Sequence, residues 1–78
     1  MTDSQVIEEM RKKGCRITKQ RRIILDVILN YEFNSCKEIY YRVIRDDPTI
    51  GMATVYRMIN LLEEMNIIRR IEKIEVIR

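Results

Sequence analysis

The most informative segment of the chain is Ile50 to Arg57, which reads Ile-Gly-Met-Ala-Thr-Val-Tyr-Arg. A helix that begins near Gly51 and continues to residue 65 advances by about 100° per residue, which sorts its side chains onto two faces. One face is apolar and should pack in the core, and the other is polar and should face outward. The apolar face comprises Met52, Val55, Ile59, Leu62 and Asn66, with Met58 and Met65 at its margin; the polar face comprises Ala53, Tyr56, Arg57, Asn60 and Glu64.

The composition of the polar face differs from that of an ordinary solvated face, which is normally filled with lysine and glutamate. It begins with alanine, tyrosine, arginine and asparagine, and these residue types reach base edges and phosphates. The acidic pair Glu63 and Glu64 stands at the far end, clear of a polyanion that meets the N-terminal turns. These features predict a recognition helix over residues 51–65. In the alternative interpretation, Tyr56 covers the edge of the core and Arg57 is an ordinary surface residue.

A cationic segment precedes this helix in the chain. Residues 11–22 contain seven basic residues and no acidic one, whereas the net charge of the whole chain is only +3. Alone, such a cluster is typical of a solvated face. Together with the polar face of residues 51–65, it indicates nucleic acid as the partner. The basic residues are Arg11, Lys12, Lys13, Arg16, Lys19, Arg21 and Arg22.

Two helices are predicted in the first part of the chain. The first follows capping side chains at residues 2–4 and ends at Gly14, because glycine readily adopts the left-handed conformation of a helix terminus. The second runs from a cap at Thr18 to about Asn30, and apolar residues surround so much of it that it should be central. They are Ile23, Ile24, Val27, Ile28 and Tyr31 on one side, extended by Leu25 and Leu29.

A third helix leads into the recognition helix. Ser35 and Glu38 form a capping box at its start, and it ends near Asp46 because Pro48 disfavours helical geometry at the residue before it. A short turn over residues 47–50 then connects it to residues 51–65. A helix, a tight turn and a helix with a polar outward face make up a helix-turn-helix.

The last segment, residues 67–78, is rich in β-branched residues and is predicted to form a two-stranded hairpin with its turn near Glu72 and Lys73. The spacing of its isoleucines also suits a helix, which is the alternative. A hairpin in this position would be the wing of a winged helix, and Arg69 and Arg70 would suit contact with phosphates. The predicted fold is therefore mainly α: a winged helix-turn-helix of four helices followed by a short two-stranded β-hairpin wing.

Composition limits the function classes. At 78 residues the chain is expected to form one domain over 1–78, helical to about residue 66. Charged residues make up 35% of it, no apolar run approaches the roughly 18 residues of a membrane span, and the first ten residues are too polar for a signal peptide. We therefore expect a cytoplasmic protein without membrane contact. With no histidine and no nucleophile beside a base, we expect no enzyme, no small-molecule substrate and no cofactor.

The two cysteines, Cys15 and Cys36, have neither the spacing nor the partner ligands of a zinc site or a disulfide framework. Cys36 shares a helical face with Ile39 and Val43 and is expected in the core. Cys15 has basic neighbours, and a redox role would need them to stabilise its thiolate.

Three motifs in order carry a family resemblance. The chain resembles the N-terminal DNA-binding domain of the ferric uptake regulator (Fur) family in these three motifs. They are residues 14–22, the stretch that ends Glu38-Ile39-Tyr40, and the run from Asp47 to Arg57 followed by residues 60–64. The resemblance covers about residues 5–72. It implies a winged helix and a transcriptional regulator, expected to be a repressor, whose recognition helix lies in the major groove of an A·T-rich half-site.

The resemblance also implies roles for individual residues. Tyr56 would contact thymine methyl groups, Arg57 a base edge or phosphate, and Thr54 the DNA backbone. Arg16 would reach toward an A·T-rich minor groove, where narrow grooves favour a cation. Charge and position extend the predicted interface to three further basic residues as backbone contacts, namely Lys19, Arg21 and Arg22.

The chain also departs from the family pattern. The resemblance implies a second domain that dimerises and carries metal ligands, which we expect this chain to lack, and Phe33 stands where family members often have a histidine that helps to bind the sensing metal. We therefore expect no bound metal. A single copy should bind double-stranded DNA weakly, so tight binding would need two copies, as a homodimer or with a partner chain, on a palindromic site. The alternative function is a winged-helix protein–protein interaction module that pairs with a full-length regulator or another partner.

Overall fold

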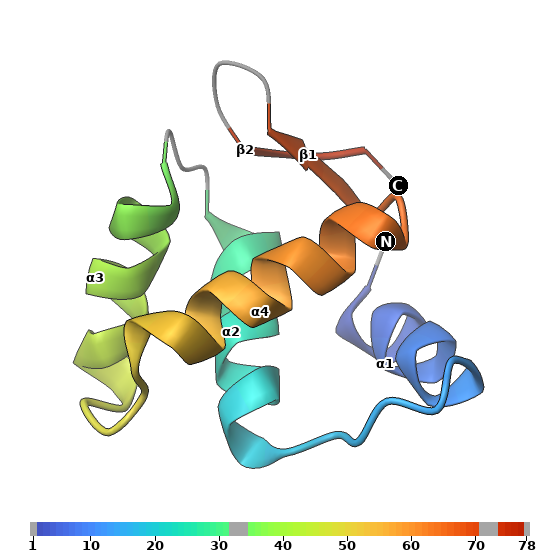
Figure 1. The fold of residues 1–78 in the computed structure, drawn as a ribbon, viewed down its shortest axis with the longest axis horizontal. Coiled ribbons are helices and arrows are strands. Elements are labelled where there is room, and N and C mark those ends of the chain that lie inside the picture. Colours follow the sequence, from blue (N-terminus) through green and yellow to red (C-terminus); the bar gives the residue numbers. More distant parts are fainter. Residues whose placement is uncertain (1, 32–34, 71–73, 78) are drawn as a thin grey trace.

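The protein is described by a computed structural model that covers residues 2–31, 35–70 and 74–77. The predicted winged helix-turn-helix is confirmed: α4 crosses in front of α2, with α3 near one of its ends and α1 and the hairpin near the other (Figure 1). The elements follow in the order α1 (Asp3–Lys12), α2 (Lys19–Asn30), α3 (Cys36–Asp46), α4 (Met52–Glu64), β1 (Ile68–Arg70) and β2 (Ile74–Val76).

Side-chain caps set the start of the first three helices, as the sequence predicts. The hydroxyls of Thr2, Thr18 and Ser35 each accept a hydrogen bond from the backbone N–H three residues later, at 3.2–3.3 Å. Each bond satisfies a donor that has no partner within the first helical turn. After α1, Gly14 adopts a φ of +82°, so it does end the helix in the left-handed conformation.

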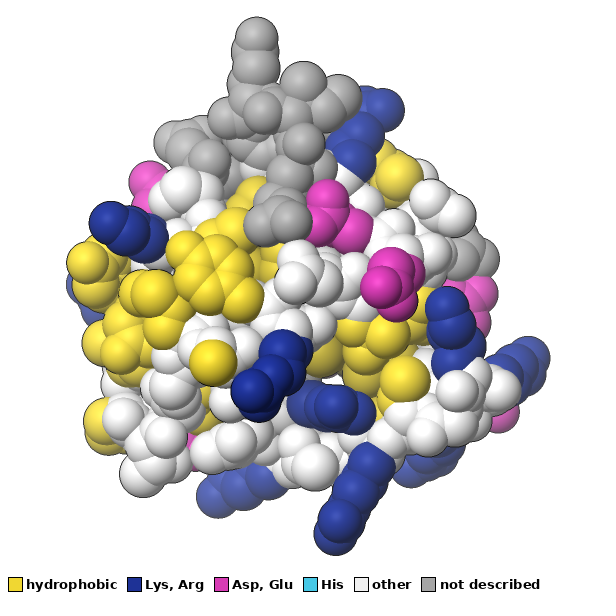
Figure 2. Space-filling view, viewed as in Figure 1, with side chains coloured by type: hydrophobic (Ala, Val, Ile, Leu, Met, Phe, Trp, Pro, Cys, Tyr) yellow, Lys and Arg dark blue, Asp and Glu magenta, His cyan; other side chains and the backbone are white. Residues whose placement is uncertain are grey.

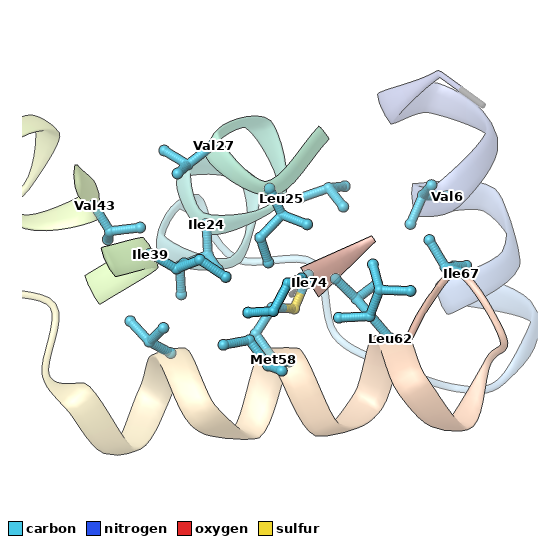
Figure 3. Packing of buried hydrophobic residues seen from close by; sticks show 14 of the residues in the cluster. Val6, Ile24, Leu25, Val27, Ile39, Val43, Met58, Leu62, Ile67 and Ile74 are labelled. Atoms are coloured by element: carbon cyan, nitrogen blue, oxygen red, sulfur yellow. The ribbon is translucent and has the colours of Figure 1, made fainter. Parts of the chain in front are cut away.

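The core lies between α2, α3, α4 and the hairpin, and α1 closes one side of it. Figure 3 shows side chains of all these elements converging. Among the described residues no polar or charged side chain is buried, so burial of apolar surface is the main force that holds the helices together. The buried residues are Val6, Met10, Ile24, Leu25, Val27, Ile28, Ile39, Val43, Ile50, Val55, Met58, Ile59, Leu62, Met65, Ile67, Ile68 and Ile74.

The structure corrects four placements made from helical periodicity, one of which is Met65, which is 7% exposed and lies in the core instead of at its margin. Asn66 is exposed instead of lying on the apolar face, because α4 ends at Glu64 and Asn66 adopts a φ of 57° that turns the chain toward β1. Met58 is only 3% exposed and belongs to the core rather than to its margin. Tyr31 is 48% exposed, since it follows the last residue of α2 and has extended backbone.

The C-terminal segment forms an antiparallel hairpin in which Ile68 pairs with Val76 and Arg70 with Ile74. The prediction of strands is confirmed and the alternative of a helix is wrong. Ile67, Ile68 and Ile74 are buried, and β1 contacts α4, so tertiary packing explains why this segment is extended. The predicted turn near Glu72 and Lys73 lies outside the described residues, as does Phe33.

The two cysteines are half-buried, and both pack against the core. Cys36 was expected to be fully buried, but as the first residue of α3 it lies at the edge of the core. No helix in the described part of the chain is long and apolar enough to cross a membrane.

Candidate nucleic-acid interface

The face of α4 that points away from the core carries the residues predicted for it. Ala53, Arg57, Asn60 and Glu64 are exposed, and Tyr56 is half-buried. The opposite face, which contains the buried Val55, Met58, Ile59 and Leu62, fixes the rotation of the helix about its axis. Packing therefore holds the arginine and the tyrosine on the outside of the molecule.

The turn before α4 is fixed by its own hydrogen bonds. The Asp47 carboxylate accepts from the backbone N–H of Thr49 at 3.0 Å and from its hydroxyl at 2.6 Å, and the N–H of Ile50 donates to the carbonyl of Asp47 at 3.2 Å. The Ile50 side chain, 1% exposed, anchors the turn in the core. At the N-cap, Gly51 has no side chain to cover the first N–H groups of α4, so this end of the helix is open to a partner.

The start of α2 lies near this turn. The hydrogen bonds from the Thr49 hydroxyl and N–H lower the pKa of Asp47, and the charge of Lys19 lowers it further. The start of α2 and the turn between α3 and α4 both lie at the lower side of the molecule in Figure 1. Many of the Lys and Arg side chains on the face that α4 crosses lie in its lower half, with others at its upper left and upper right, and Asp and Glu side chains lie above the middle and at the edges (Figure 2). The start of α2 and the N-terminal end of α4 both lie toward this lower side in Figure 1.

The loop between α1 and α2 presents Arg16 to solvent. Cys15 and Ile17 pack against the core on either side of it, while the Arg16 side chain is exposed. The guanidinium Nη1 of Arg21 donates to the carbonyl oxygen of Arg16 at 2.6 Å, and the backbone N–H of Arg21 donates to the Thr18 hydroxyl at 3.2 Å. Of the other predicted site residues, Lys19 and Arg22 are exposed and Thr54 is half-buried.

The first turn of α2 concentrates positive charge. It contains no acidic residue, and Lys19 and Arg21 lie at the end of the helix where the backbone N–H groups already carry partial positive charge. Cations at this end destabilise a helix slightly in isolation. The arrangement is favourable when an anion such as a phosphate approaches.

A cluster that the sequence did not reveal joins α2 to α3. Arg42 on α3 donates from Nη2 to the Tyr31 hydroxyl at 2.9 Å and from Nη1 to Asp46 at 3.3 Å, and its guanidinium carbon lies 4.7 Å from the centre of the Tyr31 ring. The hydrogen bond with Tyr31, followed by the charges of Tyr31 and Asp46, raises the pKa of Arg42. The spacing of Arg42 and Asp46 on one helix was a readable signal, but the contact with Tyr31 depends on the tertiary fold.

Comparison with known proteins settles the family. A family model described as "Ferric uptake regulator family" matches residues 12–76. The chain belongs to the ferric uptake regulator family. It is 44% identical over 64 residues to a ferric uptake regulation protein of Brucella suis, an alignment that covers 81% of this chain and 45% of that protein.

Solved structures agree with this assignment. A ferric uptake regulator of Helicobacter pylori superposes with a TM-score of 0.80 at 25% identity, covering 97% of this Fur-family chain and 58% of that one. A manganese uptake regulator superposes with a TM-score of 0.77 at 30% identity, covering 88% and 56% of the two chains. The chain thus spans about half the length of the relatives it matches.

The family name implies a metal, which histidine, cysteine, aspartate and glutamate side chains would have to bind. The sequence has no histidine. In the described part of the chain, no group of three or more cysteine, aspartate or glutamate side chains is placed to hold a metal ion. The residues present do not fit such a site, and no step of the function proposed below passes through a metal.

Proposed function

We propose that this chain is a sequence-specific DNA-binding module of a Fur-like transcriptional regulator, a repressor, that inserts α4 into the major groove. One observation carries the proposal. The face of α4 that exposes Arg57 and the cationic start of α2 lie on one surface, and the start of α2 is near the turn between α3 and α4. A surface that combines base-reading side chains with flanking cations suits a duplex better than any other partner.

The proposed roles follow from position. Arg57 and Tyr56 are on the part of α4 that would enter the groove, with Arg57 donating to a base edge or phosphate and Tyr56 contacting thymine methyl groups. Thr54, one turn nearer the N-terminus, would donate to the sugar-phosphate backbone. The exposed Arg16 would enter a narrow A·T-rich minor groove beside the major-groove site.

Phosphates would be held by exposed cations at the start of α2. Lys19 and Arg22 are proposed as the backbone contacts, supported by the partial positive charge of the helix terminus. Arg21 differs from these two residues, because its guanidinium already has a partner within the protein.

Affinity considerations favour two copies on the DNA. Binding through phosphates alone gives dissociation constants of roughly 10⁻⁴ to 10⁻⁶ M, whereas specific regulators reach about 10⁻⁸ to 10⁻¹¹ M. Two good base contacts, at about 1–3 kcal/mol each, would place one copy between these ranges. We propose that tight binding uses two copies on a palindromic A·T-rich site.

A second candidate function is supported by the hairpin. Val76 and Ile77 are 41% and 42% exposed, and exposed apolar side chains at the end of a domain suit a protein partner. If this were the main role, Arg57→Ala would leave function intact and substitutions over residues 67–77 would abolish it.

The test is a titration of the chain with an A·T-rich duplex and a random duplex at several salt concentrations. We expect the logarithm of the association constant to fall with the logarithm of salt concentration at a slope of about −3 to −6, as expected for a few neutralised phosphates. Sizing the protein with and without duplex shows whether two copies bind. Absence of duplex binding at low salt would overturn the proposal and favour the protein-contact function.

A further inference from the structure

We infer that Arg21 is a positioning residue: it holds the loop that presents Arg16 and makes no phosphate contact of its own. The inference rests on the proposed function, because it assigns Arg16 a place in the DNA interface. It also replaces the expectation, based on charge and position alone, that Arg21 is one more cation along the DNA backbone.

The contact itself is short and charged. Nη1 of Arg21 lies 2.6 Å from the carbonyl oxygen of Arg16, whereas hydrogen bonds from a cationic donor to an oxygen usually measure about 2.7–2.9 Å. Arg21 is half-buried, while Arg16, Lys19 and Arg22 are exposed. The side chain of Arg21 is therefore turned toward its own protein, unlike the basic residues around it.

The position of Arg21 in α2 supports the same conclusion. With Thr18 as the N-cap, Arg21 is the third residue of the helix, where the partial positive charge of the backbone disfavours a cation. A bond to the carbonyl oxygen of Arg16 offsets this repulsion, because that oxygen carries partial negative charge. The same residue also donates its backbone N–H to the Thr18 hydroxyl, so both ends of Arg21 bind the segment that precedes α2.

The loop needs such a bond if Arg16 is to be held in place. The N–H of Cys15 donates to the carbonyl of Met10 at 2.9 Å, and Cys15 and Ile17 pack against the core. Arg16 lies between them with an exposed side chain, and the bond from Arg21 fixes its carbonyl. A loop fixed in this way loses less conformational entropy when Arg16 enters a groove.

The first test needs no DNA. Backbone ¹⁵N order parameters for residues 15–17 are measured without DNA in the unsubstituted chain, in R21Q and in R22Q. R22Q is the matched control, because it replaces the adjacent arginine, which is exposed. In R21Q we expect the order parameters to fall from about 0.85, typical of rigid backbone, toward about 0.6, and in R22Q to stay unchanged. Because Arg21 lies outside the buried core, R21Q should remain folded, which a thermal melt verifies. Unchanged order parameters in folded R21Q would overturn the inference.

The second test is a double-mutant cycle on an A·T-rich duplex with R16A, R21Q and the double variant. If Arg21 acts through Arg16, R21Q should weaken binding about 3- to 10-fold alone and by less than about 1.5-fold once Arg16 is absent. If Arg21 contacts phosphate directly, the fold-losses of affinity in R16A and R21Q multiply in the double variant, and the inference is wrong. A wild-type chain that bound no duplex would overturn the proposed function, whereas the order parameters would still decide whether Arg21 holds the loop.

Discussion

The carboxylate of Asp47 holds Thr49 through two hydrogen bonds, at 3.0 Å to the backbone nitrogen and at 2.6 Å to the hydroxyl oxygen. The positive charge of Lys19, at the start of α2, also acts on this carboxylate and lowers its pKa. One carboxylate thus links the element that orients α4 to the element proposed to bind phosphate.

The first prediction concerns the pH dependence that follows from Asp47. The Thr49 bonds and Lys19 lower its pKa in the folded protein, so its ionisation favours the fold above the ordinary carboxyl pKa of 3.8, and this stabilisation is lost as pH falls through the lowered value. Asp47→Ala should reduce the free energy of unfolding at pH 7 and have much less effect near pH 2. Urea unfolding at both pH values measures this. Thr49→Val, which keeps the backbone N–H, should show a smaller loss, and an equal loss for Asp47→Ala at both pH values would refute the assignment.

The second prediction concerns Arg42, which connects α3 to the end of α2. Arg42→Ala removes the bond to Tyr31, the stacking on its ring and the pairing with Asp46 together. It should lower the melting temperature more than Tyr31→Phe, which keeps the ring, or Asp46→Asn, which removes only a surface ion pair. None of the three should change the preference for an A·T-rich duplex over a random one. A smaller effect of Arg42→Ala than of Asp46→Asn would contradict the importance of the Tyr31 contact.

The third prediction uses adjacent leucines on α4. Leu62 is fully buried in the core, whereas Leu61 is half-buried at its edge. Leu62→Ala should cost about 2–5 kcal/mol of unfolding free energy, because it removes transfer energy and leaves a cavity. In a domain whose total stability is of order 5–15 kcal/mol, this is a large fraction. Leu61→Ala should cost clearly less, and equal losses in chemical denaturation would show that α4 is rotated about its axis.

Much of the fold is readable from local chemistry. The caps at Thr18 and Ser35 and the helix end at Gly14 depend on residues within one turn, so the sequence predicts them correctly. Asn66 was misplaced because periodicity does not show where a helix stops. The hairpin was open to a helical alternative for a related reason, since the packing of Ile68 against the core decides between the two.

The candidate site was predictable as a set of residues but not as a set of contacts. Periodicity places Arg57 on the outer face of α4, and the structure agrees. The bond from Arg21 to the carbonyl of Arg16 was not predictable, because it depends on how one long side chain folds back along its own loop. The proximity of Lys19 to Asp47 likewise exists only once α2 and α3 are packed together.

The fourth prediction concerns two carboxylates at the junction of α1 and α2. Partial burial raises the pKa of Asp3, and the charge of Asp26 and a hydrogen bond with it raise it further. A raised carboxyl pKa means that ionisation destabilises the fold, so stability is greater below the unfolded pKa and decreases as pH rises through the folded value. Asp3→Asn should stabilise the protein slightly at pH 7, because it removes a charge that partial burial and the nearby carboxylate of Asp26 both disfavour. Glu8→Gln serves as the control, because Glu8 is exposed on the same helix. If Asp3→Asn stabilised the protein equally at pH 2, the ionisation of Asp3 would not be the cause.

The fifth prediction separates base reading from charge. Arg57→Lys keeps a cation on α4 but loses the planar guanidinium, which can donate two parallel hydrogen bonds to a base edge in the proposed site. It should reduce the preference for the A·T-rich duplex by about 1–3 kcal/mol while leaving the salt slope nearly unchanged. Lys19→Ala should weaken binding to both duplexes alike and make the slope less steep by about 0.9, because one phosphate contact is lost. If Arg57→Lys and Lys19→Ala gave the same pattern, α4 would be acting only as a charged surface and the assignment of sequence reading to it would fail.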